Sequence, residues 1–168
     1  AKYPPDALRY FLLSVHYRKP IDYTDENLDN AARAIERLYI AWRDAQDALK
    51  KLGGRVELDP SSLDSASQKV LVELESIRSA FMEAMNDDLN TAAASGQFFK
   101  LVHAINQMLG NASVEHRPLL SRALDIFDEF RQVLGYPICE PGEYLAKRAD
   151  DLLRRVGLTR AEVERLIA

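Results

Sequence analysis

Residues 25–52 read DENLDNAARAIERLYIAWRDAQDALKKL, and their apolar side chains recur at steps of three and four. This spacing places the apolar side chains on one face of a long helix, which faces a core or partner helices. Thr24 is the expected N-cap, because its hydroxyl can accept a hydrogen bond from the first turn. Gly53-Gly54 is the expected end, since glycine adopts the left-handed conformation without strain. The face comprises Leu28, Ala31, Ile35, Leu38, Trp42, Ala45, Leu49 and Leu52.

The same periodicity predicts further helices and no convincing strand. We expect helices at 5–16, from after Ser62 to about Met85, at 91–109, at 114–134 and at 143–156. Asn90 is the expected N-cap of the helix at 91–109, and Gly110-Asn111 is its expected end. Thr159 and Glu162 have the spacing of a capping box and open a last helix. The pattern predicts an all-α fold: an antiparallel bundle of about four core helices, with a docked N-terminal helix and short C-terminal helices. The first helix is expected to bury Leu8, Phe11, Leu12 and Val15.

Composition limits the class of protein. The chain has 168 residues, 47% of them hydrophobic and 29% charged, which suits one globular domain. No apolar run approaches the roughly 20 residues of a membrane span, so no membrane partner is expected. The single cysteine, Cys139, forms no internal disulfide, which fits a reducing, cytoplasmic compartment. The net charge of −4 disfavours a general nucleic-acid binder but allows a local basic surface.

No cluster of catalytic groups is apparent in the sequence. His16, His103 and His116 lack the spacing of metal ligands, and no glycine-rich phosphate-binding loop is present. Cys139 has no histidine near it in sequence to act as a base. Asp87-Asp88 is compatible with a divalent ion, but acidic residues before a helix are more often turn formers. We therefore expect no catalytic residue, no metal ligand and no cofactor in this chain.

Basic residues remain as candidate binding groups. Arg9, Arg18 and Lys19 surround the end of the first helix, and Arg33 and Arg37 lie four residues apart on the second. Arginine and lysine can bind phosphate oxygens of a nucleic-acid backbone. The alternative is a solvated face in which Asp29 and Glu36 are acidic neighbours, and spacing alone favours that alternative.

Three strings resemble one enzyme family. Residues 6–9 read DALR, the string that names a helical domain of class I aminoacyl-tRNA synthetases. Residues 10–28, YFLLSVHYRKPIDYTDENL, and residues 81–91, FMEAMNDDLNT, resemble two segments of cysteinyl-tRNA synthetases. Four letters are weak evidence, but the two longer strings in this order are strong together. The resemblance runs from Tyr3 to Leu134 and is thin between Glu140 and Val156.

The resemblance implies an ATP-dependent ligase that joins cysteine to tRNA(Cys). The family's nucleotide-binding domain, which uses ATP, magnesium and one zinc, would lie upstream, and its anticodon-reading subdomain downstream. Ala1 in place of a start methionine, and a last helix that stops soon after it begins, are expected of an excised segment. Residues 1–168 would form a single helical domain that docks tRNA. Within it, residues 1–24 would be a junction, residues 25–134 the bundle and residues 135–168 an extension.

The resemblance also suggests roles for particular residues. Arg9, Arg18, Lys19, Arg33 and Arg37 become candidates for contact with the tRNA backbone. His16, Tyr17 and Arg18 would lie near the junction with the catalytic domain. Two alternatives stay open: the helical domain of a tRNA-free ligase that joins cysteine to an amino-sugar inositol, and a free-standing protein-interaction bundle.

Overall fold

The computed structural model describes residues 2–110 and 113–167, which form helices and connections without a strand among them. It has two compact units, residues 1–138 and residues 139–168. The first unit contains α1 (Pro5–Leu13), α2 (Asp25–Lys51), α3 (Ser65–Asn86), α4 (Thr91–Gly110) and α5 (Arg117–Leu134), with short 3-10 turns at Pro60–Ser62 and Val114–His116. The second contains α6 (Pro141–Arg155) and α7 (Arg160–Ile167). The expected all-α fold is confirmed.

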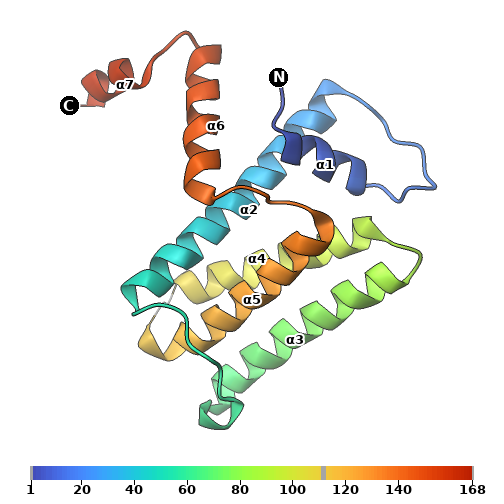
Figure 1. Ribbon diagram of the computed structural model, residues 1–168, viewed down its shortest axis with the longest axis vertical. Helices are drawn as coiled ribbons and strands as arrows, with labels where there is room; N and C mark the ends of the chain where they lie inside the picture. Colours follow the sequence, from blue (N-terminus) through green and yellow to red (C-terminus); the bar gives the residue numbers. More distant parts are fainter. Residues whose placement is uncertain (1, 111–112, 168) are drawn as a thin grey trace. The chain divides into compact units, whose positions relative to one another are not determined.

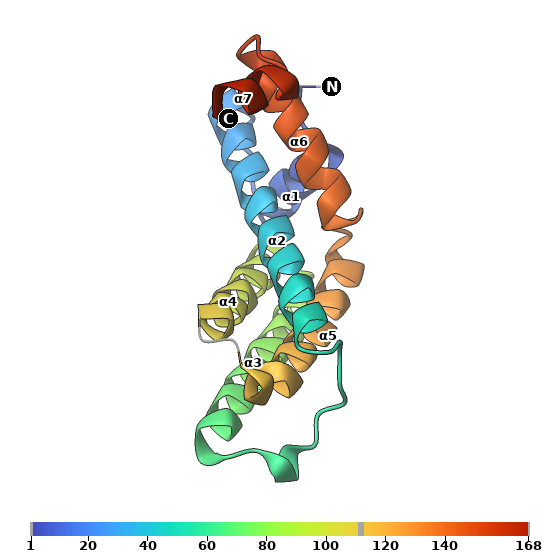
Figure 2. The same cartoon turned by 90° about the vertical axis from the view of Figure 1, so that its left-hand side faces the viewer.

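The helices α2 to α5 form an antiparallel bundle. The colour gradient of Figure 1 shows that successive helices from α2 to α5 alternate in direction. Both α2 and α3 pack on α4 and α5, so that α4 and α5 form the middle of the bundle. Figure 2 shows the N-terminal half of α2 beside α1 and its C-terminal half beside α4 and α5. The length of α2 therefore lets one helix join the bundle to α1.

Aromatic rings dominate the core of the bundle. The rings of Phe81 and Phe130 stack with their centroids 3.8 Å apart. Phe98 presents an edge to Phe127 at 4.7 Å and to Phe130 at 5.6 Å, and Trp42 lies 5.6 Å from Phe127. These five side chains are buried, and the edge-to-face contacts that Phe98 makes are an arrangement that aromatic pairs prefer. The apolar face predicted for α2 is confirmed, with Leu52 only half-buried.

The buried face predicted for the first helix is wrong in part. Leu8 is 36% exposed and Leu12 is 61% exposed, whereas Ala7 and Phe11 are buried. Ala7 and Phe11 share a cluster with residues of α2, because the small alanine allows the two helices to approach closely. The helix also ends at Leu13, three residues before the expected end. In so short a helix, apolar residues occur on both faces, and periodicity cannot select the buried one.

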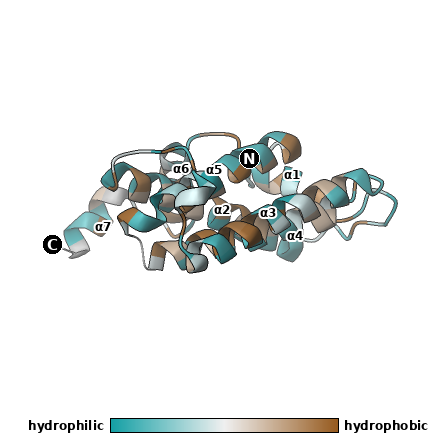
Figure 3. Cartoon of the chain, turned by 90° about the horizontal axis from the view of Figure 1, so that it is seen from below, coloured by the Kyte–Doolittle hydropathy of each residue, from teal (hydrophilic) through white to brown (hydrophobic). Residues whose placement is uncertain are grey.

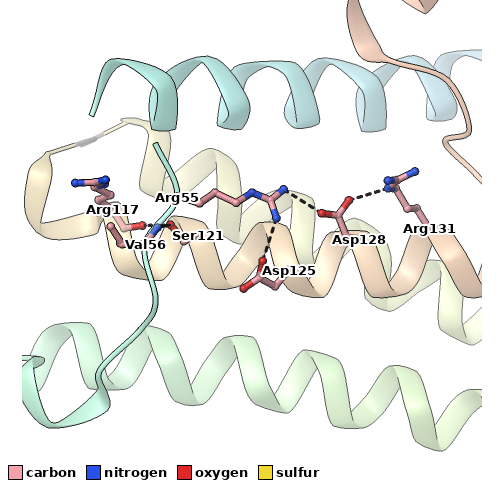
Figure 4. A network of polar contacts seen from close by, with 7 residues as sticks. All are labelled: Arg55, Val56, Arg117, Ser121, Asp125, Asp128 and Arg131. Atoms are coloured by element: carbon pink, nitrogen blue, oxygen red, sulfur yellow. Dashed lines mark hydrogen bonds and ion pairs between the residues drawn. The ribbon is translucent and has the colours of Figure 1, made fainter. Parts of the chain in front are cut away.

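The connection from α2 to α3 is held against α5, as Figure 4 shows. The guanidinium group of Arg55 donates to Asp125 and to Asp128, both at 3.0 Å. The backbone N–H of Val56 donates to the hydroxyl of Ser121 at 3.1 Å. Arg117 donates to the carbonyl oxygens of Gly53 and Gly54, which follow the end of α2. These bonds guide the chain past α5, so that α3 can pack on the side of α4 and α5 away from α2.

Several predicted caps are confirmed. The Thr24 hydroxyl accepts from Asn27 N–H at 3.2 Å, and the Asn90 side chain accepts from Ala93 N–H at 3.1 Å. In the second unit, the backbone N–H of Thr159 donates to Glu162 at 2.7 Å, and the N–H of Glu162 donates back to the threonine hydroxyl. The hydrogen bonds from Thr159 lower the pKa of the Glu162 carboxyl. The expected helix end at residues 110–111 falls partly outside the described residues.

Polar and apolar residues alternate around the helices, as the hydropathy colours of Figure 3 show. Among the residues that the structure describes, no helix combines the length and the apolar character needed to cross a bilayer.

Candidate functional site

The DALR string begins with a buried acidic residue. Asp6 is 4% exposed, and its Oδ2 accepts from the hydroxyl of Tyr39 at 2.5 Å and from the backbone N–H of Ile138 at 3.2 Å. The N–H of Ile138 also lies 3.1 Å from the Tyr39 oxygen. A buried carboxyl needs such partners, because leaving it without hydrogen bonds would be costly. Asp6 thus joins α1, α2 and the chain after α5.

Two further residues of the same turn of α1 contact the chain after α5. Arg9 donates to the carbonyl oxygen of Gly135, and the Tyr10 ring lies edge-on to the Tyr136 ring at 5.6 Å. Gly135 has φ +69°, and a side-chain carbon there would lie 2.9 Å from the Arg9 guanidinium. Both the backbone conformation and the lack of space therefore favour glycine at this position. We call Asp6, Arg9, Tyr10 and residues 135–138 the DALR clamp.

Tyr136 anchors the DALR clamp to the bundle. Its hydroxyl is 2.7 Å from the hydroxyl of Ser95 on α4, and its ring stacks near Phe98 at 6.2 Å. Burial raises the pKa of the Tyr136 hydroxyl. The DALR string accordingly has a structural role in this chain, since its acidic and basic residues both bind residues 135–138.

A second cluster joins two loops that are far apart in sequence. The hydroxyl of Tyr17 donates to Asp88 Oδ1 at 2.7 Å, and it accepts from Arg18 Nε at 2.9 Å. Arg18 Nη2 lies 3.2–3.3 Å from the two carboxylate oxygens, and His16 Nε2 lies 3.8 Å from Oδ2. The His16 and Tyr17 rings are stacked with centroids 4.8 Å apart. We call His16, Tyr17, Arg18 and Asp88 the Asp88 clasp.

The loop that carries Asp88 has an unusual backbone. Asp88 and Leu89 both have φ +53°, a region that residues with side chains adopt rarely. Leu89 is 59% exposed, so its own packing does not account for this conformation. No group of three or more acidic, histidine or cysteine residues that could hold a metal ion occurs among the described residues, and Asp88 binds Tyr17 and Arg18.

Arg33 and Arg37 line a groove between α2 and the chain from α1 to Asp22. The groove has a volume of about 860 Å³. Arg33 donates to the neutral side chain of Asn30 at 2.7 Å, and the Arg37 guanidinium lies 5.3 Å from the Phe99 ring centre. Both arginines are exposed, and the acidic residues Asp22 and Glu36 line the same groove. Apolar residues of the groove are Tyr10, Phe11, Val15, Ile21, Ala34 and Ile40.

The five basic candidates therefore fall into different settings. Arg33 and Arg37 lie together in the groove, and Arg18 lies in the Asp88 clasp with exposed Lys19 beside it in sequence. Arg9 belongs to the DALR clamp. Sequence reasoning missed Asn30 as the partner of Arg33 and Tyr39 as the partner of Asp6, because neither residue stands in a recognisable motif.

Comparison with known proteins places this arrangement in a family context. Residues 80–138 match the family model described as the DALR domain. Part of the chain thus matches the DALR-domain model, and nearly all of it is similar to part of proteins named cysteine–tRNA ligase. It is 35% identical over 165 residues to the cysteine–tRNA ligase of Geobacter sulfurreducens, covering 98% of this chain and 33% of that protein. It is 36% identical over 169 residues to that of Nitratidesulfovibrio vulgaris, covering 98% and 33%.

The chain spans about a third of the length of the curated relatives it matches. The matched DALR region contains Asp88 and residues 135–138, whereas the DALR string itself precedes it. The DALR clamp and the Asp88 clasp each connect residues that precede α2 with residues of the matched region. In the Asp88 clasp, the two longer strings that resemble cysteinyl-tRNA synthetases, residues 10–28 and 81–91, therefore meet in space.

Proposed function

We propose that this chain is the tRNA-docking helical part of a cysteine–tRNA ligase. The observation that carries the proposal is its similarity, over 98–99% of its length, to proteins named cysteine–tRNA ligase. The ATP-dependent joining of cysteine to tRNA, with its magnesium and zinc, would belong to the parent protein, and we assign none of its steps to residues of this chain. The names of these relatives favour this function over a tRNA-free ligase or a free-standing interaction bundle.

The proposed role is positional. The rigid aromatic core of the bundle and the DALR clamp would hold a surface for tRNA(Cys) at a set place between a nucleotide-binding domain and an anticodon-reading subdomain. His16, Tyr17 and Arg18 would lie near the first of these. Such a protein would act in the cytoplasm, where tRNA is charged.

Arg33 and Arg37 are the first candidates for contact with the tRNA backbone. They lie one helical turn apart, so both can reach phosphates of one strand segment. Their contacts in the structure are with an amide and an aromatic ring, which leave each guanidinium charged and accessible. Arg9, in contrast, is engaged with the Gly135 carbonyl, and we assign it to the DALR clamp.

We expect the Arg33→Ala/Arg37→Ala variant of the chain to bind tRNA more weakly than the unchanged chain. A variant that contacts fewer phosphates releases fewer counterions when it binds, so the slope of log affinity against log salt should become shallower by about one to two. Fluorescence anisotropy with labelled tRNA(Cys) between low and moderate salt measures both quantities. The decrease should be similar for an unrelated tRNA, because backbone contacts carry no sequence information.

The matched control is Arg43→Ala/Lys50→Ala, which removes two exposed positive charges from the same helix outside the groove. It changes the net charge equally, so a general charge effect would lower the affinity of both variants alike. Equal salt slopes for the two variants would place Arg33 and Arg37 on a merely solvated face.

A further inference from the structure

We propose that His16, Tyr17 and Arg18 form a phosphate-binding site that Asp88 occupies in the free protein, and that an RNA backbone phosphate displaces Asp88 on binding. The inference rests on the proposed tRNA-docking function. It adds that the Asp88 carboxylate competes with the RNA phosphate for the same donors. Asp88 would then limit binding at this site to ligands that present a strong anion in a suitable place.

The donors of the Asp88 clasp suit a phosphodiester. All three side chains converge on the two oxygens of one carboxylate: Tyr17 at 2.7 Å, Arg18 at 3.2–3.3 Å and His16 at 3.8 Å. A phosphodiester likewise offers two non-bridging oxygens that share one negative charge. Guanidinium and hydroxyl groups are common donors to backbone phosphates.

The state of His16 fits this arrangement. The Nδ1 atom of His16 accepts from the backbone N–H of Arg18 at 3.3 Å. That bond leaves Nε2 to carry the proton, and Nε2 is the atom that faces Asp88. The histidine can therefore direct an N–H toward an anion without an added proton, and the Tyr17 ring stacked on it keeps it in place.

The site is open to a large ligand. The Arg18 side chain is 68% exposed and that of Asp88 is 43% exposed. Tyr17 is 61% exposed, and Lys19 is also exposed. Asp87 is the other acidic residue in the same loop and is exposed as well. An RNA strand could thus reach the donors without any unfolding of the bundle.

Asp88 is also held in a way that allows its displacement. Ion pairs between exposed side chains contribute little to stability, because water screens them. Asp88 and Leu89 lie in the left-handed region, which carries a cost for residues with side chains. Release of the carboxylate would let this loop relax, and that relaxation would offset part of the loss of the internal bonds.

The test compares Asp88→Asn with Asp87→Asn in the 168-residue chain. Both variants remove one negative charge from the same loop, but only the first removes the competing carboxylate. We expect Asp88→Asn to raise the affinity for tRNA by about two- to fivefold over Asp87→Asn, the scale of one exposed ion pair. Its salt slope should be steeper by about one, since one more phosphate is neutralised.

Further variants make the result specific. Adding Arg18→Ala to Asp88→Asn should abolish the gain, because the phosphate donor is then missing. Asp88→Gly should reproduce the gain, and glycine suits the positive φ, so this variant tests the site even if Asp88→Asn disturbs the loop. Equal tRNA affinities for Asp88→Asn, Asp88→Gly and Asp87→Asn would overturn this inference but not the proposed function. If the unchanged chain and all variants fail to bind tRNA, the proposed function is overturned with it.

Discussion

We expect Phe130→Ala to lower the free energy of unfolding of the first unit by about 3–5 kcal/mol, the usual cost of deleting a buried phenylalanine. Phe130 is fully buried, stacks on Phe81 at 3.8 Å and receives the edge of Phe98 at 5.6 Å. Its removal leaves a cavity among α3, α4 and α5, and it also removes two aromatic contacts. The two rings around it come from α3 and α4 and cannot close the cavity without moving a helix.

Trp42 is the only tryptophan of the chain and lies in this core, so its fluorescence during denaturant unfolding reports on the first unit. Val133→Ala is the matched control, because Val133 is on the same helix and is 49% exposed. It should change the unfolding free energy by less than about 0.5 kcal/mol. A Phe130→Ala effect as small as that of the control would show that the aromatic cluster does not hold α3, α4 and α5 together.

The DALR clamp should have the second largest effect. We expect Asp6→Ala to lower the unfolding free energy by about 1–3 kcal/mol, because it removes the hydrogen bond that the buried hydroxyl of Tyr39 donates to Asp6. Tyr39→Phe removes the same bond from the other side. In a double-mutant cycle, the two substitutions together should cost less than the sum of the separate costs.

Hydrogen exchange gives a second, local measurement. The backbone N–H of Ile138 donates to Asp6 and also contacts the Tyr39 oxygen, so its exchange should be faster in Asp6→Ala and faster again in the double variant. Asp47→Ala, at an exposed position of α2, should leave this exchange unchanged. Additive costs in the cycle, together with unchanged exchange at Ile138, would mean that Asp6 and Tyr39 act independently.

The all-α fold could be predicted because its signals are local. The apolar face of residues 28–49 repeats over many turns, and so it outweighs any single exception. Thr24, Asn90 and Thr159 were identifiable as caps, since a cap depends on residues two or three positions away. In α1, with nine residues, the same rule was wrong in part: Phe11 is buried as predicted, but Leu8 and Leu12 are apolar and exposed.

For the candidate sites, the sequence indicated some of the residues but not the contacts between them. The strings at residues 6–9, 16–18 and 87–88 stood out by their resemblance to a family, but nothing in them indicates their partners. Asp6 bonds to Ile138, 132 residues away, and Tyr17 bonds to Asp88, 71 residues away. Reading each string alone therefore grouped Arg9 with Arg18 as a ligand-binding residue, whereas Arg9 holds residues 135–138.

For this protein, the sequence by itself determined the helical class, the approximate helix ends and the relation to a family, because short-range periodicity, capping and resemblance need no knowledge of distant contacts. Only the tertiary structure decided that α4 and α5 lie between α2 and α3, and that Asp6 and Asp88 each join segments far apart in the chain. The physical reason is that these pairings depend on how whole helices pack. A buried carboxyl or an exposed guanidinium finds its partner only after the packing has brought the two together.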